Sequence, residues 1–63
     1  MKIKKGENYA EFIKRIRIKK KYTVAEFAYE LGVSATIVSL WENEKRYPSF
    51  KNQRLIDDYA KEL

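Results

Sequence analysis

The fold is decided by residues 23–43, which read TVAEFAYELGVSATIVSLWEN. Thr23 and Glu26 have the T-x-x-E spacing of a capping box, in which side chains and backbone at a helix start satisfy each other's hydrogen bonds. Gly32 predicts the end of that helix, because glycine adopts the left-handed backbone conformation without steric cost. Ser34 is a good N-cap for a second helix. The stretch therefore predicts two short helices joined by a tight turn.

Apolar residues recur at helical spacing in both short helices. The two stripes consist of Phe27, Ala28 and Leu31 in the first helix, and Ile37, Val38 and Trp41 in the second. Isolated helices of about eight residues do not hold their shape in water, so these two must pack on the rest of the chain. Two capped helices with a glycine-containing turn are a helix-turn-helix signature.

Helical signals also flank this stretch. Asn8 and Glu11 have capping spacing and precede an apolar face, which predicts a helix running to about Lys20. Pro48 interrupts the chain, and a last helix is predicted from about Ser49 or Asn52 to the terminus. The sequence as a whole predicts a single all-α domain over residues 1–63, a compact bundle of four to five short helices. The helix-turn-helix lies at about residues 24–43.

The composition excludes several classes of function. The chain has 63 residues, a formal net charge of +5, no cysteine and no histidine. Disulfides, thiolate zinc sites and the commonest general base are therefore absent. Asp57 and Asp58 are adjacent, so on a helix they point about 100° apart and form no catalytic pair. We expect no enzyme, no cofactor, no metal, no small-molecule ligand and no membrane segment, and a cytoplasmic, nucleoid-associated protein.

Charge is unevenly distributed along the chain. Residues 1–21 carry nine Lys/Arg and two Glu, a balance of +7, and residues 22–44 carry four Glu and no Lys/Arg. Residues 45–63 return to a balance of +2. Two basic blocks around an acidic middle favour a phosphate backbone as partner, although charge runs are also ordinary solvated faces. Residues 1–7 are expected to form a flexible basic arm, which either lies in a DNA groove or is disordered, with a short edge strand as another possibility.

Residues 13–48 resemble the Cro and lambda-repressor type of helix-turn-helix domain, the XRE family. The matching residues are Arg17, Thr23, Glu26, Phe27, Ala28, Leu31, Gly32, Val33, Ser34, Val38, Trp41, Glu42, Asn43, Lys45, Arg46 and Pro48. The resemblance implies a DNA-binding bundle that usually acts as a symmetric dimer. The helix that starts at Ser34 would then enter the major groove.

The resemblance implies base contacts by one face of that helix. The residues are Ser34, Ala35, Thr36, Ser39 and Leu40. Independently, this face lies opposite the apolar stripe, and its hydroxyl and methyl groups suit base edges and thymine methyls. The alternative is that these are only small exposed residues, with Leu40 at the rim of the core. No Arg, Gln or Asn begins the helix, so modest discrimination that relies partly on DNA shape is expected.

Phosphate contacts are implied for residues at the edges of the groove. They are Thr23, Lys21, Asn43, Lys45, Arg46 and Ser49, and the neighbouring Lys19 and Lys20 could add charge. The alternative is a solvated turn. Arg17 and Glu42 are expected to form a partly buried ion pair, the alternative being an exposed and weak one.

Two positions depart from the family pattern. Val24 stands where the family often has a glutamine that bonds a phosphate, so one backbone clamp is expected to be missing. Glu44 stands where the family usually has glycine, which disfavours a left-handed cap and predicts a reshaped turn or a longer helix. The glutamate would also place a negative charge near the DNA.

The resemblance implies a sequence-specific transcription regulator and, by analogy, a Cro-like repressor of a phage or mobile element that acts on a short palindromic operator. A homodimer is expected, with candidate contacts at Tyr47, Phe50, Leu55 and Tyr59. One alternative is an excisionase-like architectural protein that bends double-stranded DNA. Another is a protein-interaction adaptor, such as an antirepressor or an antitoxin-like protein with a protein partner, which the four glutamates of residues 22–44 would permit.

Overall fold

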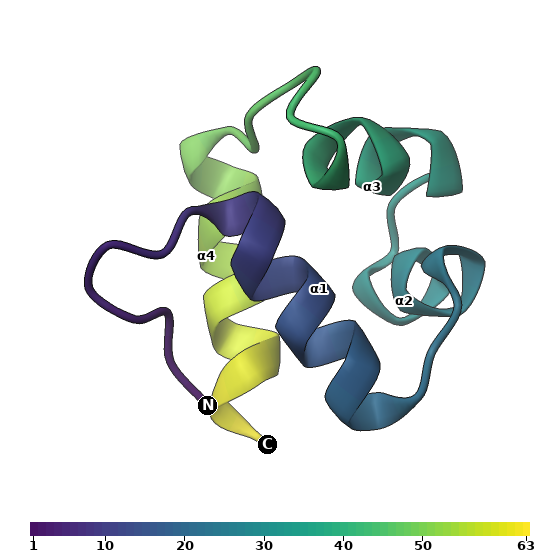
Figure 1. Cartoon of the computed structure of the whole chain (residues 1–63). Coiled ribbons are helices and arrows are strands. Elements are labelled where there is room, and N and C mark those ends of the chain that lie inside the picture. The colour runs from purple at the N-terminus through teal and green to yellow at the C-terminus, as the bar shows by residue number, and fades with distance from the viewer.

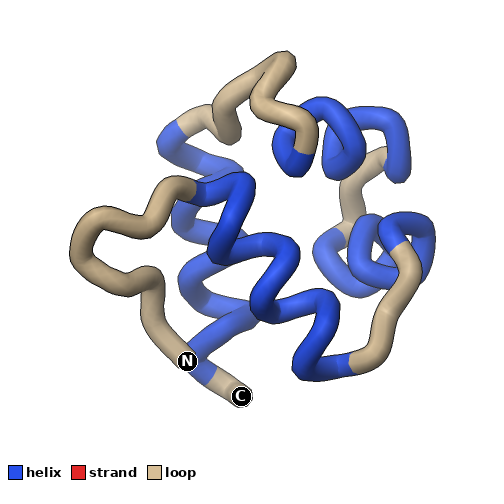
Figure 2. Tube along the Cα trace, viewed as in Figure 1, coloured by secondary structure: helices blue, strands red, loops and turns tan.

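The computed structural model describes all 63 residues and contains four helices and no strand (Figure 2). The helices are α1 (Tyr9–Lys20), α2 (Val24–Leu31), α3 (Ala35–Glu42) and α4 (Phe50–Lys61). Figure 1 shows α1 crossing in front of α4, with α2 and α3 to one side of that pair. The predicted all-α bundle is confirmed, with four helices. None of them is long and apolar enough to cross a membrane.

The helix boundaries follow from local capping. Thr23 Oγ1 accepts a hydrogen bond from Glu26 N at 3.1 Å, and Glu26 Oε1 accepts one from Thr23 N at 2.8 Å. The predicted box at the start of α1 is formed in the same way. Gly32 ends α2 with φ 76°, and Ser34 caps α3. Each short helix therefore has a stop and a start that its own residues provide.

The four helices share one apolar core. Its fully buried large side chains are Phe12, Ile13, Ile16, Phe27, Val38, Trp41 and Ile56. Burial of each stabilises the fold by roughly 1.5–3 kcal/mol, so α2 and α3 are held mainly by packing. The core position predicted for Trp41 is confirmed, since its side chain is 2% exposed. The core fixes α3 by one face and leaves the other face to solvent.

A partly buried polar link joins α1 to α4. Tyr9 Oη donates to both carboxylate oxygens of Asp57, at 3.0 and 3.1 Å. Burial, and then this hydrogen bond, raise the pKa of the Tyr9 phenol to about 12. Asp57 thus serves the fold, while its neighbour Asp58 is exposed.

The N-terminal segment differs from the free arm expected from the sequence. The Met1 ammonium donates to Ala60 O and Leu63 O, both at 2.9 Å. A cation at the end of α4 interacts favourably with its carbonyl groups. Met1 and Ile3 also pack against the core. In Figure 1 the two termini lie together, at the end of the molecule away from α3.

The same segment is tied to α1 by an ion pair. Arg15 Nε and Nη2 donate to the two Glu7 carboxylate oxygens at 2.9 Å each, and Arg15 Nη2 also donates to Lys2 O at 2.7 Å. The Arg15 guanidinium lowers the pKa of Glu7 below its usual value. Sequence reasoning missed these contacts, because nothing in the spacing of Glu7 and Arg15 marks them as partners.

Candidate nucleic-acid interface

The solvent-facing side of α3 presents small side chains. Ser34, Ala35 and Thr36 are exposed at its N-terminal end. Ser39 and Leu40, one turn further, are half-buried. All five therefore lie on the helix face expected from the sequence, but only the first three are fully open. The base contacts themselves stay a prediction.

The end of α3 is braced by Asn43. Its Nδ2 donates to Ser39 O at 2.8 Å and lies 3.4 Å from Ser39 Oγ. The amide nitrogen expected to bind a phosphate is thus turned back onto the helix. Because Ser39 Oγ accepts from Asn43, the Ser39 hydroxyl proton is free to donate to a base edge.

The ion pair expected between Arg17 and Glu42 is formed and is partly buried. Arg17 Nε and Nη2 donate to the Glu42 carboxylate oxygens at 2.8 and 3.0 Å, and Glu42 is 6% exposed. Arg17 Nη1 also donates to Tyr22 O at 3.1 Å. The hydrogen bond to Glu42 raises the pKa of Arg17 above its usual value. One guanidinium therefore holds both the end of α3 and the segment that leads into α2.

The start of α2 is less open to anions than its position suggests. The Thr23–Glu26 capping box already engages the backbone N–H groups of both residues. The exposed Lys21 precedes it with φ 58°, in the left-handed region. Lys20 Nζ lies 5.7 Å from the centroid of the Tyr22 ring. The phosphate contacts expected at this end stay a prediction, and two of the backbone donors there are already engaged.

The loop between α3 and α4 presents two exposed cations. Lys45 N and Arg46 N donate to Leu40 O at 2.9 and 3.3 Å, which fixes the loop against the end of α3. Ser49, a predicted phosphate contact, accepts from Asn52 N at 3.3 Å as the N-cap of α4. Its hydroxyl proton stays available, and the phosphate contact stays a prediction.

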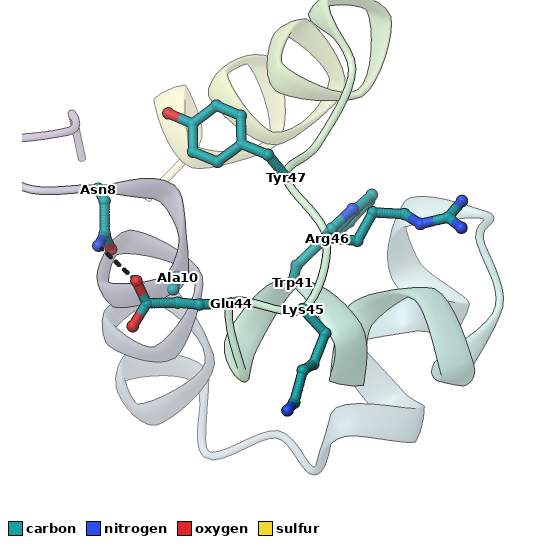
Figure 3. A pocket seen from close by; sticks show the side chains of 7 residues that line it. All are labelled: Asn8, Ala10, Trp41, Glu44, Lys45, Arg46 and Tyr47. Atoms are coloured by element: carbon teal, nitrogen blue, oxygen red, sulfur yellow. Dashed lines mark hydrogen bonds between the residues drawn. The ribbon is translucent and has the colours of Figure 1, made fainter.

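Glu44 corrects an expectation about this loop. Its φ is 58°, so it occupies the left-handed conformation that a glutamate was expected to disfavour, and α3 is not prolonged. Figure 3 shows its side chain turned toward Asn8, whose Nδ2 lies 3.4 Å from Glu44 Oε1. The backbone bonds of the next two residues to Leu40 O hold the turn in place despite the unfavourable φ.

The dimer candidates separate into two groups. Tyr47 and Phe50 are 63% and 71% exposed. Leu55 and Tyr59 are half-buried and pack against the core, where the Tyr59 ring meets Phe27 edge-on at 5.9 Å. The structure thus leaves Tyr47 and Phe50 open to solvent and places Leu55 and Tyr59 partly buried at the edge of the core.

No lysine of the structure forms an ion pair. Both ion pairs of the structure use arginine, with Glu7 and Glu42 as partners, and no lysine takes part. Unpaired lysines keep their full attraction for a polyanion. No group of three or more His, Cys, Asp or Glu side chains is arranged to hold a metal ion.

Comparison with known proteins agrees with this geometry. A helix-turn-helix family model, of the XRE type, matches residues 13–58, which include α2, α3 and most of the core. No curated protein and no solved structure gives a significant match. The match spans more than half of the chain and contains the capped pair α2–α3. The chain therefore belongs to the XRE-type helix-turn-helix family of DNA-binding transcription regulators.

Proposed function

We propose that the chain is a Cro-like, sequence-specific repressor that binds a short palindromic operator as a homodimer. The observation that carries the proposal is the free face of α3, where Ser34, Ala35 and Thr36 are exposed. The partly buried ion pair between Arg17 and Glu42 supports it, because that pair fixes the orientation of α3. A rigid helix with an open, uncharged face suits a major groove.

Base reading would rest on small groups. The hydroxyls of Thr36 and Ser39 each supply one hydrogen bond, and Ala35 and Leu40 supply apolar contact with thymine methyl groups. Such contacts discriminate less strongly than a bidentate arginine or glutamine. Part of the specificity would come from the shape and deformability of the DNA.

The affinity for DNA would come mainly from contacts between basic side chains and the phosphate backbone of the DNA. Lys45 and Arg46 at one edge of α3, and Lys21 at the start of α2, are exposed and unpaired. Each phosphate that they neutralise releases counterions, so binding would weaken steeply as salt rises.

A dimer is proposed because one eight-residue recognition helix covers only a few base pairs. Tyr47 and Phe50 are the exposed aromatic side chains of the loop and of the start of α4. Their burial against a second copy would give a two-fold symmetric contact. A role in a phage or mobile element, and a cytoplasmic, nucleoid-associated location, are proposed by analogy with Cro.

Fluorescence anisotropy tests the proposal. The duplex from upstream of the chain's own gene is compared with a scrambled duplex, each at several salt concentrations. We expect a preference of about 10³-fold or more and a steep salt dependence. Equal and weak binding to both duplexes would contradict sequence-specific control.

An architectural, excisionase-like role is the second candidate. The specific observation that favours it is the absence of Arg, Asn or Gln at the start of α3, together with Val24 in place of a phosphate-binding glutamine. Strong bending of DNA that carries several phased sites would distinguish this role from repression. Failure to bind any DNA at low salt would instead support the adaptor reading.

A further inference from the structure

Leu40 is the one half-buried apolar side chain that does not belong to the core. Every other half-buried apolar side chain of the protein packs against the core. The carbonyl oxygen of Leu40 accepts from Lys45 N and Arg46 N, so the residue holds the following loop through its backbone. Its side chain is therefore available for another contact.

Thr36 is a neighbour of Leu40 on the same face of α3. The two residues are four apart, so their side chains lie next to each other along the helix. Thr36 is exposed, whereas Val38 and Trp41 point into the core from the opposite side. Ala35, also exposed, adds a methyl group at the N-terminal end. The solvent-facing side of α3 thus presents adjoining methyl groups.

No charged side chain lies among these methyl groups. Glu42, the only charged residue of α3, is turned inward and is paired with Arg17. Glu44 follows the helix, and its side chain is turned toward Asn8 (Figure 3). The cations of the loop beyond the helix are those that we assign to phosphates.

The polar groups of this face discriminate poorly between base edges. Asn43 has its Nδ2 turned onto Ser39 O and Oγ, at 2.8 and 3.4 Å, so it cannot make the paired hydrogen bonds by which an amide reads adenine. The remaining groups are the hydroxyls of Ser34, Thr36 and Ser39. A hydroxyl both donates and accepts, so it fits donor and acceptor edges alike. The methyl groups are therefore the part of the face that can select a base.

We propose that Leu40, with Thr36 beside it, reads the 5-methyl group of a pyrimidine and is indifferent to the hydrogen-bonding edge of that base pair. Thymine carries this group in the major groove and cytosine does not. In 5-methylcytosine the group occupies the same ring position. The protein then treats 5-methylcytosine as thymine, and methylation of a cytosine facing α3 creates a contact.

This inference deepens the proposed function and rests on it, since α3 must enter the major groove. It names the chemical feature that the site selects, which is a 5-methylpyrimidine. Leu40 is the residue that determines this specificity.

A duplex selected from a randomised pool is the probe. The pool contains the four ordinary bases, and the duplex that is bound most tightly is resynthesised with uracil in place of thymine, one T·A pair at a time. This change removes the methyl group and nothing else. We expect at least one pair in each half of the site at which the loss weakens binding roughly fourfold, the effect of one buried methyl group. Changing both symmetric pairs together should weaken binding roughly tenfold or more.

Cytosine and 5-methylcytosine at the same two positions, each opposite guanine, complete the comparison. Cytosine should weaken binding to about the level of uracil, and 5-methylcytosine should restore it to within about threefold of thymine. All four duplexes have the same phosphates, so the release of counterions is the same for each.

Variants of the protein assign the effect to the side chain. Leu40→Ala should reduce the difference between thymine and uracil to less than about twofold with little change in the thermal melt, because the side chain is not packed against the core. Leu40→Met keeps an apolar side chain of similar volume and should retain most of the difference. Lys45→Ala is the matched control and should weaken binding to all four duplexes by a similar factor.

Three results would overturn the inference. One is a selected duplex that binds equally well with thymine and with uracil at every position. Another is 5-methylcytosine that does not restore binding, because the edge of the base pair would then be what is read. The third is a uracil effect that Leu40→Ala leaves unchanged, because the methyl groups would then act through the deformability of the DNA.

These three results leave the proposed function intact, since each is obtained on a sequence that the protein has selected. A selection that converges on no sequence contradicts sequence-specific control itself, and with it this inference.

Discussion

Arg17 holds both carboxylate oxygens of Glu42, at 2.8 and 3.0 Å, and with its remaining nitrogen donates to Tyr22 O at 3.1 Å. The pair connects the last residue of α3 to α1, and the third bond connects α1 to the entry of α2. The two helices of the helix-turn-helix are therefore oriented by the same side chain. This makes the pair a structural support of the proposed DNA contact, although neither residue is on the exposed face of α3.

Removal of the Glu42 carboxylate should be strongly destabilising. Glu42→Ala leaves the Arg17 guanidinium half-buried without its partner, and we expect the free energy of unfolding to fall by about 2–4 kcal/mol. Urea denaturation followed by circular dichroism measures this loss. Glu30→Ala, at an exposed and unpaired position of α2, is the matched control and should change little. A melting temperature of Glu42→Ala within a degree of the wild type would show that the pair does not support the fold.

The raised pKa of Tyr9 predicts that the protein loses stability at alkaline pH. Its folded pKa is raised from 10.0 to about 12, so folding favours the protonated phenol. The stabilisation is complete below about pH 10 and is lost as the pH rises toward 12. Tyr9→Phe removes the bond to Asp57 and should cost about 1.5–3 kcal/mol at neutral pH. The difference between wild type and this variant should shrink above pH 10 in urea titrations. Tyr29→Phe, at an exposed position, should run parallel to the wild type throughout.

Replacing either of the two non-glycine residues at positive φ by glycine should increase the stability of the protein. Lys21 and Glu44 both have φ 58°, a conformation that costs other residues roughly 1–2 kcal/mol. Glycine relieves that strain but is more flexible in the unfolded chain, and the weak Asn8 contact at 3.4 Å is lost in Glu44→Gly. We expect each change to stabilise the protein by about 0.5–1 kcal/mol in urea denaturation. Lys45→Gly, in the same loop but not at positive φ, should destabilise it. A loss of stability in Glu44→Gly would mean that its side chain contributes more than its backbone costs.

Capping and periodicity are why so much of the fold could be predicted. Thr23, Gly32, Ser34 and Ser49 each act within one helical turn, so sequence spacing alone was sufficient to place the helix ends. The N-terminal segment could not be predicted, because Met1 contacts Ala60 and Leu63 across the whole chain.

The candidate site could also be predicted in part from the sequence. Its exposed face follows from the periodicity of α3. The left-handed turn at Glu44 was not predicted, because local backbone bonds from Lys45 N and Arg46 N to Leu40 O hold the turn and override the preference of the glutamate itself.

Deletion of residues 1–5 should reduce stability without reducing the electrostatic part of DNA binding. The segment covers the core with Met1 and Ile3 and places a cation at the end of α4. We expect a lower melting temperature and an unchanged slope of log Kd against log salt for DNA binding. Ile3→Ser is the control that keeps all the lysines and should lower the melting temperature in the same direction. A shallower slope after the deletion would mean that the segment's lysines reach a phosphate.

Lys45 and Arg46 should each account for about one phosphate contact. Their side chains are exposed, and their backbone N–H groups are bonded to Leu40 O, so alanine at either position removes charge without releasing the loop. Each substitution should reduce the salt slope of DNA binding by about 1 and weaken binding to specific and scrambled duplexes by a similar factor. Lys61 is the last residue of α4, and the C-terminus lies away from α3 in Figure 1. Lys61→Ala removes the same charge and should leave the slope unchanged. Thr36→Ala, on the exposed face of α3, should instead lower the preference for the specific duplex and leave the salt slope unchanged. The reason is that it removes a base contact and no phosphate contact. Equal effects of Lys61→Ala and Lys45→Ala would mean that net charge alone, and not the loop beside α3, controls the affinity for DNA.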